Sequence, residues 1–133
     1  MIVVIDTNVI LSALISSGLS ARVFDICLDL HDIYISEHIV KEVLDKLETK
    51  FKVSQRDINS TKAFIKKAFI KATPEGELPD ACRDPDDNNI LHLARTIDAD
   101  LIITGDKDLI VLKKFGNTAI INPRTFIEKY RNC

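Results

Sequence analysis

Apolar residues along this 133-residue chain alternate between short continuous runs and runs with helical spacing. The continuous runs are rich in β-branched residues, which is typical of strands. Because the first run contains no polar residue, we expect its strand to be buried on both faces. The predicted strands cover residues 2–5, 33–35, 100–104 and 118–121.

Between these strands, apolar residues recur every three or four positions, which predicts amphipathic helices. Ser36 and Ser54 precede two of these segments in positions where a hydroxyl caps a helix. Residues 73–83 contain two prolines and a glycine and predict a loop. The helices are expected from residue 9 to about 16, over 21–30, after Ser36, after Ser54, over about 85–97, over about 109–114, and from Pro123 onward.

Strands separated by helical connections predict an α/β fold, with a parallel central sheet covered by helices on both faces. Residues 1–133 contain neither a low-complexity linker nor an internal repeat, so we expect a single domain. In such sheets, ligands bind beyond the carboxyl ends of the strands. Polar residues that directly follow a strand are therefore candidates for function.

Composition favours a cytoplasmic globular protein. The hydrophobic fraction is 46%, and no apolar run reaches the roughly 18 residues that a membrane span requires. The amino terminus lacks the basic segment of a signal peptide. Cys27, Cys82 and Cys133 are odd in number and widely spaced, which indicates reduced thiols rather than disulfides or a zinc site.

Acidic residues occupy positions where the predicted fold would bring them together. Asp6 and Asp106 each follow an apolar strand, so both should emerge at the same edge of the sheet. Asp87 lies three residues before Ile90, which places it on the core-facing side of a helix at its first turn. Glu42 lies at the margin of the apolar face of its helix, so spacing alone leaves its direction open.

Converging carboxylates repel one another strongly. At about 4 Å and an effective dielectric constant near 20, each charged pair costs about 4 kcal/mol. A cation or a bound proton would relieve this repulsion. Ligation by oxygen alone favours Mg²⁺ or Mn²⁺ over zinc, and such ions can activate water and stabilise the leaving oxygen of a phosphodiester.

Most of these acids also have a simpler interpretation. Three acids, Asp84, Asp86 and Asp87, could simply cap and charge the start of the helix near residue 85. We favour that role for Asp84 and Asp86, whereas the inward position of Asp87 favours function. Glu42 could instead pair with Lys46, four residues later. The role of Asp108 could be limited to the start of a short helix, so it is a secondary candidate ligand. Asp6 has the weakest alternative, because a carboxylate after a buried strand needs a partner.

The net charge of −2 does not by itself indicate a nucleic-acid-binding protein. If five candidate ligands are set aside, however, 15 acids remain against 18 bases, a balance of +3. Residues 107–131 contain six bases and two acids. These counts are compatible with phosphate contact. The five acids set aside are Asp6, Glu42, Asp87, Asp106 and Asp108.

Four segments together resemble the PIN-domain family, in particular its small single-domain prokaryotic members described as toxins of toxin–antitoxin pairs. The resemblance extends from Ile2 to about Phe126, and its specificity lies in the order and spacing of the segments. They are VIDTNV at 4–9, Glu42 on the helix after Ser36, DPDD at 84–87 and ITGDKDL at 103–109.

This resemblance implies a three-layer α/β/α sandwich and cleavage of single-stranded RNA with Mg²⁺ or Mn²⁺. It also implies a homodimer and, for toxin members, a cognate antitoxin that blocks the site. By position, the family's metal-binding acids match Asp6, Glu42, Asp87 and Asp106, and a further acid matches Asp108. Thr7 or Asn8 and Thr104 match polar residues that orient the metal or its water.

Two alternatives remain open. A haloacid-dehalogenase-like phosphatase would use Asp6 as a nucleophile, but it would carry a second aspartate where this chain has Asn8. A catalytically silent module would bind RNA or an antitoxin, and its acids would serve a basic residue of the antitoxin or a structural metal. Catalysis and binding have the same sequence pattern, so an activity measurement must distinguish them.

Overall fold

The computed structural model of the chain describes residues 1–130. Within that range, six strands form one sheet in the order β3-β2-β1-β4-β6-β5. Every neighbouring pair is parallel except β5 and β6 at one edge. The strands are β1 (Ile2–Ile5), β2 (Asp32–Ile35), β3 (Ile70–Lys71), β4 (Leu101–Ile103), β5 (Lys114–Phe115) and β6 (Thr118–Ile121).

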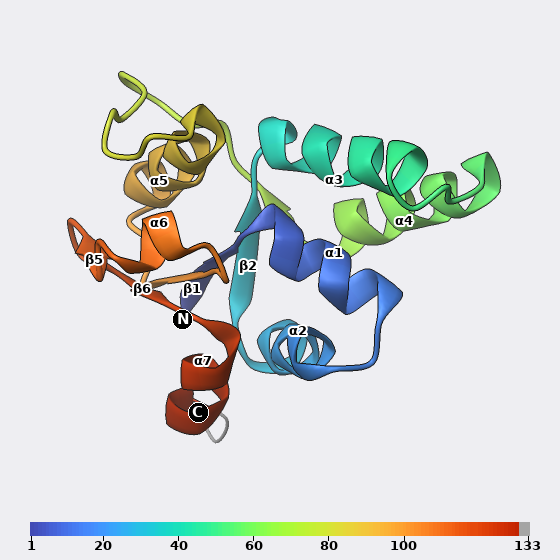
Figure 1. Ribbon diagram of the computed structural model, residues 1–133, viewed down its shortest axis with the longest axis horizontal. Helices are drawn as coiled ribbons and strands as arrows, with labels where there is room; N and C mark the ends of the chain where they lie inside the picture. The colour runs from blue at the N-terminus through green and yellow to red at the C-terminus, as the bar shows by residue number, and fades with distance from the viewer. Residues whose placement is uncertain (131–133) are drawn as a thin grey trace.

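Helices cover both faces of this sheet, which confirms the predicted three-layer α/β/α fold. Figure 1 shows α3, α4 and α5 on the upper side of the strands, with α2 and α7 on the lower side. The helices are α1 (Thr7–Ile15), α2 (Leu19–Leu30), α3 (Glu37–Thr49), α4 (Gln55–Ala68), α5 (Pro85–Ile97), α6 (Lys107–Ile110) and α7 (Pro123–Tyr130).

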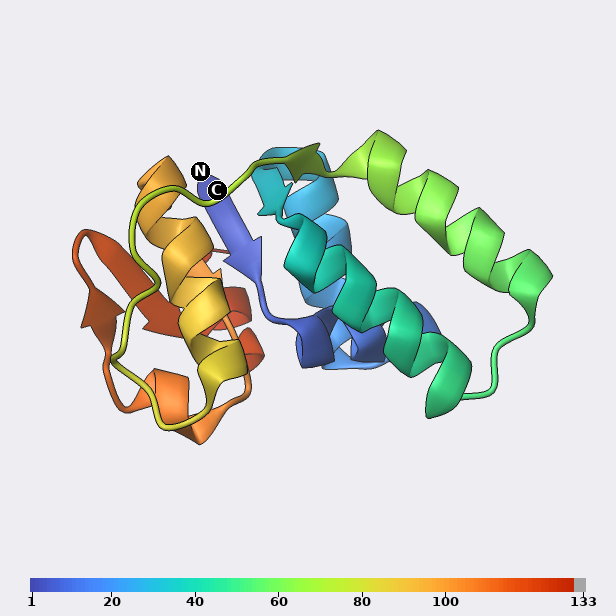
Figure 2. The same cartoon turned by 90° about the horizontal axis from the view of Figure 1, so that it is seen from above.

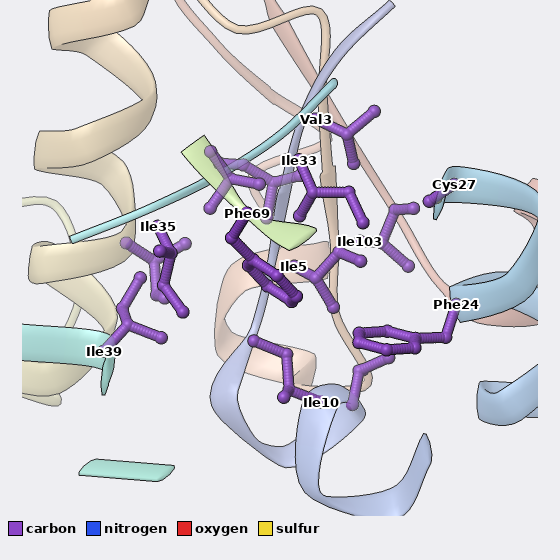
Figure 3. Packing of buried hydrophobic residues seen from close by; sticks show 14 of the residues in the cluster. Val3, Ile5, Ile10, Phe24, Cys27, Ile33, Ile35, Ile39, Phe69 and Ile103 are labelled. Atoms are coloured by element: carbon purple, nitrogen blue, oxygen red, sulfur yellow. The ribbon is translucent and has the colours of Figure 1, made fainter. Parts of the chain in front are cut away.

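The core is built around the two central strands. Val3, Val4 and Ile5 of β1 are almost completely buried, as are all three residues of β4. Figure 3 shows residues of β1, β2 and β4 packed against Phe24 of α2 and against Ile10 of α1. The predicted burial of the first strand on both faces is therefore confirmed, and β1 and β4 provide a rigid base for the residues that follow them.

The far edge of the sheet differs from the prediction. The short helix expected over about 109–114 instead spans Lys107–Ile110, and residues 114–115 form β5. Lys113 has a φ of 63°, which ends helical geometry, and Gly116 has a φ of 60° in the two-residue turn between β5 and β6. Gly-Asn is a strong signal for such a hairpin turn, so this strand could have been predicted.

The strand at the other edge of the sheet, β3, was not predicted either. It has only two residues and pairs in parallel with β2. The amphipathic pattern of the preceding helix continues through Phe69, whose side chain is buried although the helix ends at Ala68. Hydrophobic periodicity alone cannot separate such a short strand from the end of a helix.

The two predicted helix caps are confirmed. The hydroxyls of Ser36 and Ser54 accept backbone hydrogen bonds at the amino ends of α3 and α4. Cys27 and Cys82 are free, whereas Cys133 and Arg131 lie outside the described residues.

Among residues 1–130, no single helix is long and apolar enough to cross a bilayer. Taken together, α1 and α2 meet the length and composition test for a span, but they are bent by 102° relative to each other.

Candidate metal centre

The register of the two central strands brings Asp6 and Thr104 together. Ile5 pairs with Ile103, so the next residue of each strand lies side by side at the carboxyl edge of the sheet. The hydroxyl of Thr104 donates to Oδ2 of Asp6 at 2.6 Å, and it accepts the backbone N–H of Asp106 at 2.9 Å. One buried hydroxyl therefore connects the two acids that were predicted to share this edge.

Asp6 does not act as a helix cap, although it occupies the N-cap position of α1. Its side chain makes no capping hydrogen bond. It is instead 93% buried and contacts Thr104. Burial raises the pKa of Asp6 above its ordinary value, and the nearby charges of Asp106 and Glu42 raise it further, whereas the hydrogen bond from Thr104 opposes this shift. A buried carboxylate without a capping role is a suitable ligand for a cation.

Glu42 points toward the same edge. Its carboxylate accepts a hydrogen bond from the hydroxyl of Thr7, which is itself fully buried at the start of α1. The alternative pair between Glu42 and Lys46 is not among the ion pairs of residues 1–130. The direction of Glu42, which spacing left open, is therefore inward.

Asp87 has the most unusual environment of the five acids. Its side chain is buried, with only 5% of its surface exposed to solvent, and its Oδ2 has no hydrogen-bond partner among the described residues. Burial, together with the nearby carboxylates of Asp106, Asp84 and Asp6, raises the pKa of Asp87 to about 7. A buried oxygen that lacks a donor is a position where a proton or a cation is needed.

Asp106 and Asp108 complete the cluster. Oxygen atoms of Asp87, Asp106 and Asp108 all lie within 4.8 Å of one another. Oδ1 of Asp106 accepts the N–H of Asp108 at 2.8 Å and so caps α6. Asp108 is also held by Arg83, whose Nη2 donates to its two carboxylate oxygens at 3.0 and 3.3 Å. The suggestion that Asp108 only begins a helix is thus incomplete.

A small cavity of about 60 Å³ joins four of the five acids. Its lining residues come from the junction of β1 and α1, from α3 and from the start of α5, and Figure 2 shows this junction between α3 on one side and α5 on the other. Asp108 does not line this cavity, and Asn8 does so with an exposed side chain. The lining residues are Asp6, Thr7, Asn8, Glu42, Lys46, Asp84, Asp86, Asp87 and Asp106.

The other two acids have the structural roles expected for the start of α5. Asp84 caps the helix, because its Oδ1 accepts the backbone N–H of Asp86 at 3.0 Å. Asp86 lies at the surface, where its Oδ1 is 3.6 Å from Nε2 of His38. Both still line the cavity and add to its negative potential.

A polar stripe on α5 fixes the loop that leads into this site. Asn88, His92, Arg95 and Thr96 lie on one side of the helix, and each bonds to backbone atoms of residues 75–82. Asn88 makes three of these bonds: Oδ1 accepts the N–H groups of residues 81 and 82, and Nδ2 donates to the carbonyl of residue 82. These bonds hold the loop against α5, and Arg83 at the end of the loop lies beside Asp108.

These residues fit a hard divalent cation. Oxygen atoms are the available ligands, because the described residues that line the cavity include neither a histidine nor a cysteine, and Oδ2 of Asp87 has no partner among residues 1–130. Oxygen ligands of this kind suit Mg²⁺, Mn²⁺ or Ca²⁺ better than zinc. Asp6, Glu42, Asp87 and Asp106 are placed to hold such an ion, and Asp108 could join them if Arg83 released it.

The sequence profile of the PIN domain matches residues 2–108. This chain belongs to the PIN-domain family. PIN domains are in general metal-dependent nucleases, which agrees with a cluster of carboxylates at the carboxyl edge of a parallel sheet. Family membership therefore favours nuclease chemistry over the phosphatase alternative.

Two proteins are similar to this PIN domain over nearly its whole length. An uncharacterised protein of Methanocaldococcus jannaschii is 34% identical, with 96% of this chain and 90% of that protein covered. The solved structure of VapBC2 from Rickettsia felis, bound to a DNA fragment from its promoter, contains a chain of the same fold. That match has a TM-score of 0.61 and 15% identity, and it covers 92% of this PIN domain and 98% of the other chain.

Sequence reasoning missed two residues that shape the site of this PIN domain. Arg83 was not considered, because its partner Asp108 lies 25 residues away. Asn88 was not considered either, although a polar residue three positions before Leu91 lies on a half-buried side of the predicted helix. A buried amide at that position is a signal that the backbone of a neighbouring segment needs partners.

Proposed function

We propose that this PIN domain is an endoribonuclease that cleaves single-stranded RNA with Mg²⁺ or Mn²⁺. The observation that carries the proposal is the unpartnered buried oxygen of Asp87 beside Asp6 and Asp106. Such a cluster is stable only with a proton or a cation among its charges. When bound, the cation supplies Lewis acidity, which lowers the pKa of water and stabilises charge on a phosphate group.

The protein's own residues would prepare the site for this chemistry. Thr104 and Thr7 hold Asp6 and Glu42 in fixed rotamers, so the ligands are oriented before the cation arrives. Asp106 is fixed by capping α6 with one of its oxygens. Because these supports come from buried backbone and hydroxyl groups, binding a cation would require little rearrangement.

The first experiment compares cleavage of a labelled single-stranded RNA by the wild type and by Asp6→Asn, with Mn²⁺ or with EDTA. We expect cleavage only by the wild type and only with Mn²⁺, with activity reduced at least about 100-fold in the variant, because one ligand charge is removed. Glu42→Gln should behave similarly. Asp45→Asn is the matched control, because Asp45 lies on the same helix and is exposed.

Each result has a clear consequence. Cleavage that survives Asp6→Asn would place the chemistry elsewhere and contradict the proposal. RNA binding that persists in EDTA without any cleavage in Mn²⁺ would instead support the silent binding module.

We further propose that the protein is the toxin of a toxin–antitoxin pair, acting in the cytoplasm as a homodimer that a cognate antitoxin inhibits. The support is membership of the PIN-domain family together with a fold shared with a chain of the VapBC2 complex. Induced expression of the wild type in a bacterial host should arrest growth, whereas expression of Asp6→Asn to the same level should not. Equal growth of the two cultures would contradict the toxin assignment.

A further inference from the structure

Two basic residues flank the acid cavity from opposite sides. Lys46 on α3 lines the cavity one turn after Glu42, and Arg83 lies on the loop before α5, against α6. Figure 2 shows that α3 and α6 lie on either side of the junction between β1 and α1. A strand of RNA placed over the acids would therefore meet a basic residue on each side.

Lys46 lies beside the acids of the cavity, but it pairs with none of the described carboxylates. Glu42 is four residues earlier on the same helix, a spacing that commonly gives an ion pair, but its carboxylate is bound by Thr7. Among residues 1–130, the ammonium group of Lys46 forms no ion pair. The side chain is half-buried at the cavity, so its three donors remain available for an anion from outside the protein.

Arg83 contacts Asp108, but this exposed contact can be exchanged for another partner. Within residues 1–130 its guanidinium bonds to Asp108 through Nη2, and Nη1 and Nε have donors available. The side chains of this pair are 88% and 40% exposed, and exposed ion pairs are weak because water competes for both charges. The backbone beside Arg83 is fixed by Asn88, so the guanidinium stays near the site whichever partner it contacts.

We propose that Lys46 and Arg83 bind the RNA phosphates on either side of the phosphate that is cleaved. The inference rests on the proposed ribonuclease function, and it names the residues that would bind the substrate beside the cavity. Phosphates next to the reacting one would otherwise face uncompensated carboxylates at both rims of the cavity. Lys46 supplies a compact charge, and Arg83 supplies a planar fork that can exchange the carboxylate of Asp108 for a phosphate.

The test measures binding of a fluorescein-labelled, ten-nucleotide single-stranded RNA in EDTA, where metal-dependent cleavage is switched off. Lys46→Gln and Arg83→Gln should each bind about tenfold more weakly than the wild type, as expected for loss of a charge-assisted hydrogen bond. The affinity of each variant should also depend less steeply on salt. The magnitude of the negative slope of log K against log salt should decrease by about 0.7, the contribution of one phosphate contact on a single strand. The controls are Lys41→Gln on the same helix and Arg22→Gln on α2, both at exposed positions outside the cavity.

A matched single-stranded DNA identifies the group that is contacted. Because phosphates are common to both nucleic acids, the two variants should weaken DNA binding by the same factor. A loss confined to RNA would overturn the proposal in favour of contacts to the 2′-hydroxyl groups. Wild-type affinity and salt dependence in both variants, or a wild type that binds neither nucleic acid, would also overturn it.

Cleavage in Mn²⁺ separates this inference from the proposed function. Wild-type cleavage combined with unchanged RNA binding by Lys46→Gln and Arg83→Gln would leave the nuclease intact and reject the phosphate contacts. Weakened binding by both variants without any wild-type cleavage would support the contacts and reject the nuclease. The melting temperatures of both variants in EDTA should match the wild type, which excludes unfolding as the cause of weaker binding.

Discussion

The hydroxyl of Thr104 links the two strands that carry the central acids. It donates to Asp6 and accepts from the backbone of Asp106, and it is fully buried. Thr104→Val should destabilise the metal-free protein by about 1–3 kcal/mol, because the buried carboxyl group of Asp6 would lose its donor and the partly buried N–H of Asp106 its acceptor. Urea denaturation in EDTA measures this loss. Thr104→Ser keeps the hydroxyl and is the control, and equal loss in both variants would assign the effect to packing.

The raised pKa of Asp87, also a property of a single residue, predicts that the stability of the fold depends on pH. Its pKa is raised to about 7 from the ordinary 3.8, so the folded state binds more protons than the unfolded state between these values. Stability should therefore fall as the pH rises from about 4 to 7, and this contribution should be constant above that range. In EDTA, Asp87→Asn should gain stability relative to the wild type across the same interval.

The measurement is the difference in unfolding free energy between Asp87→Asn and the wild type, taken from urea denaturation at pH 5, 6, 7 and 8. Other titrating groups are common to both proteins and largely cancel in the difference. Asp45→Asn, whose side chain is exposed, should show no such trend. A difference that does not change with pH would show that Asp87 is already ionised throughout.

At the scale of elements, α5 determines the shape of the site through its polar stripe. Asn88 fixes the loop at residues 81 and 82 and so places Arg83 beside Asp108. In Asn88→Ala the backbone amides of Ala81 and Cys82 should exchange hydrogen faster, on the order of 10-fold or more, because both lose their acceptor. Hydrogen-exchange NMR measures this directly.

Two variants show whether the effect belongs to Asn88 itself. Asn88→Asp keeps the acceptor but loses the donor to the carbonyl of Cys82, so the protection of both amides should be retained in large part. Thr96→Ala removes the acceptor of the Glu75 amide at the other end of the stripe and should leave residues 81–82 unchanged. Equal exchange in Asn88→Ala and the wild type would mean that the loop is held by other contacts.

For the whole molecule, the fold was predictable because its long elements are strongly patterned. The buried run at 2–5 and the periodic segments after Ser36 and Pro85 have one consistent interpretation each. The two-residue strand β3 depends on pairing with β2, which local sequence does not encode, whereas the turn before β6 carries a local signal for β5. For the same reason, Asp6 and Asp106 could be placed at one edge from topology, whereas the contact of Arg83 with Asp108 depends on tertiary packing.

The acid cluster also predicts how the whole fold responds to metal. An ion that binds only the folded state stabilises it by about 2.7 kcal/mol at a concentration 100 times its Kd, which for a chain of this size raises Tm by on the order of 10 °C. Thermal unfolding with EDTA or with increasing Mn²⁺ measures this shift, and NaCl at equal ionic strength is the control. Asp6→Asn should differ from the wild type in two ways. Its Tm in EDTA should be higher, because a buried charge is removed, and its Tm should rise less when Mn²⁺ is added. A wild type whose Tm is unaffected by Mn²⁺ would show that repulsion in the cluster is relieved by protons alone.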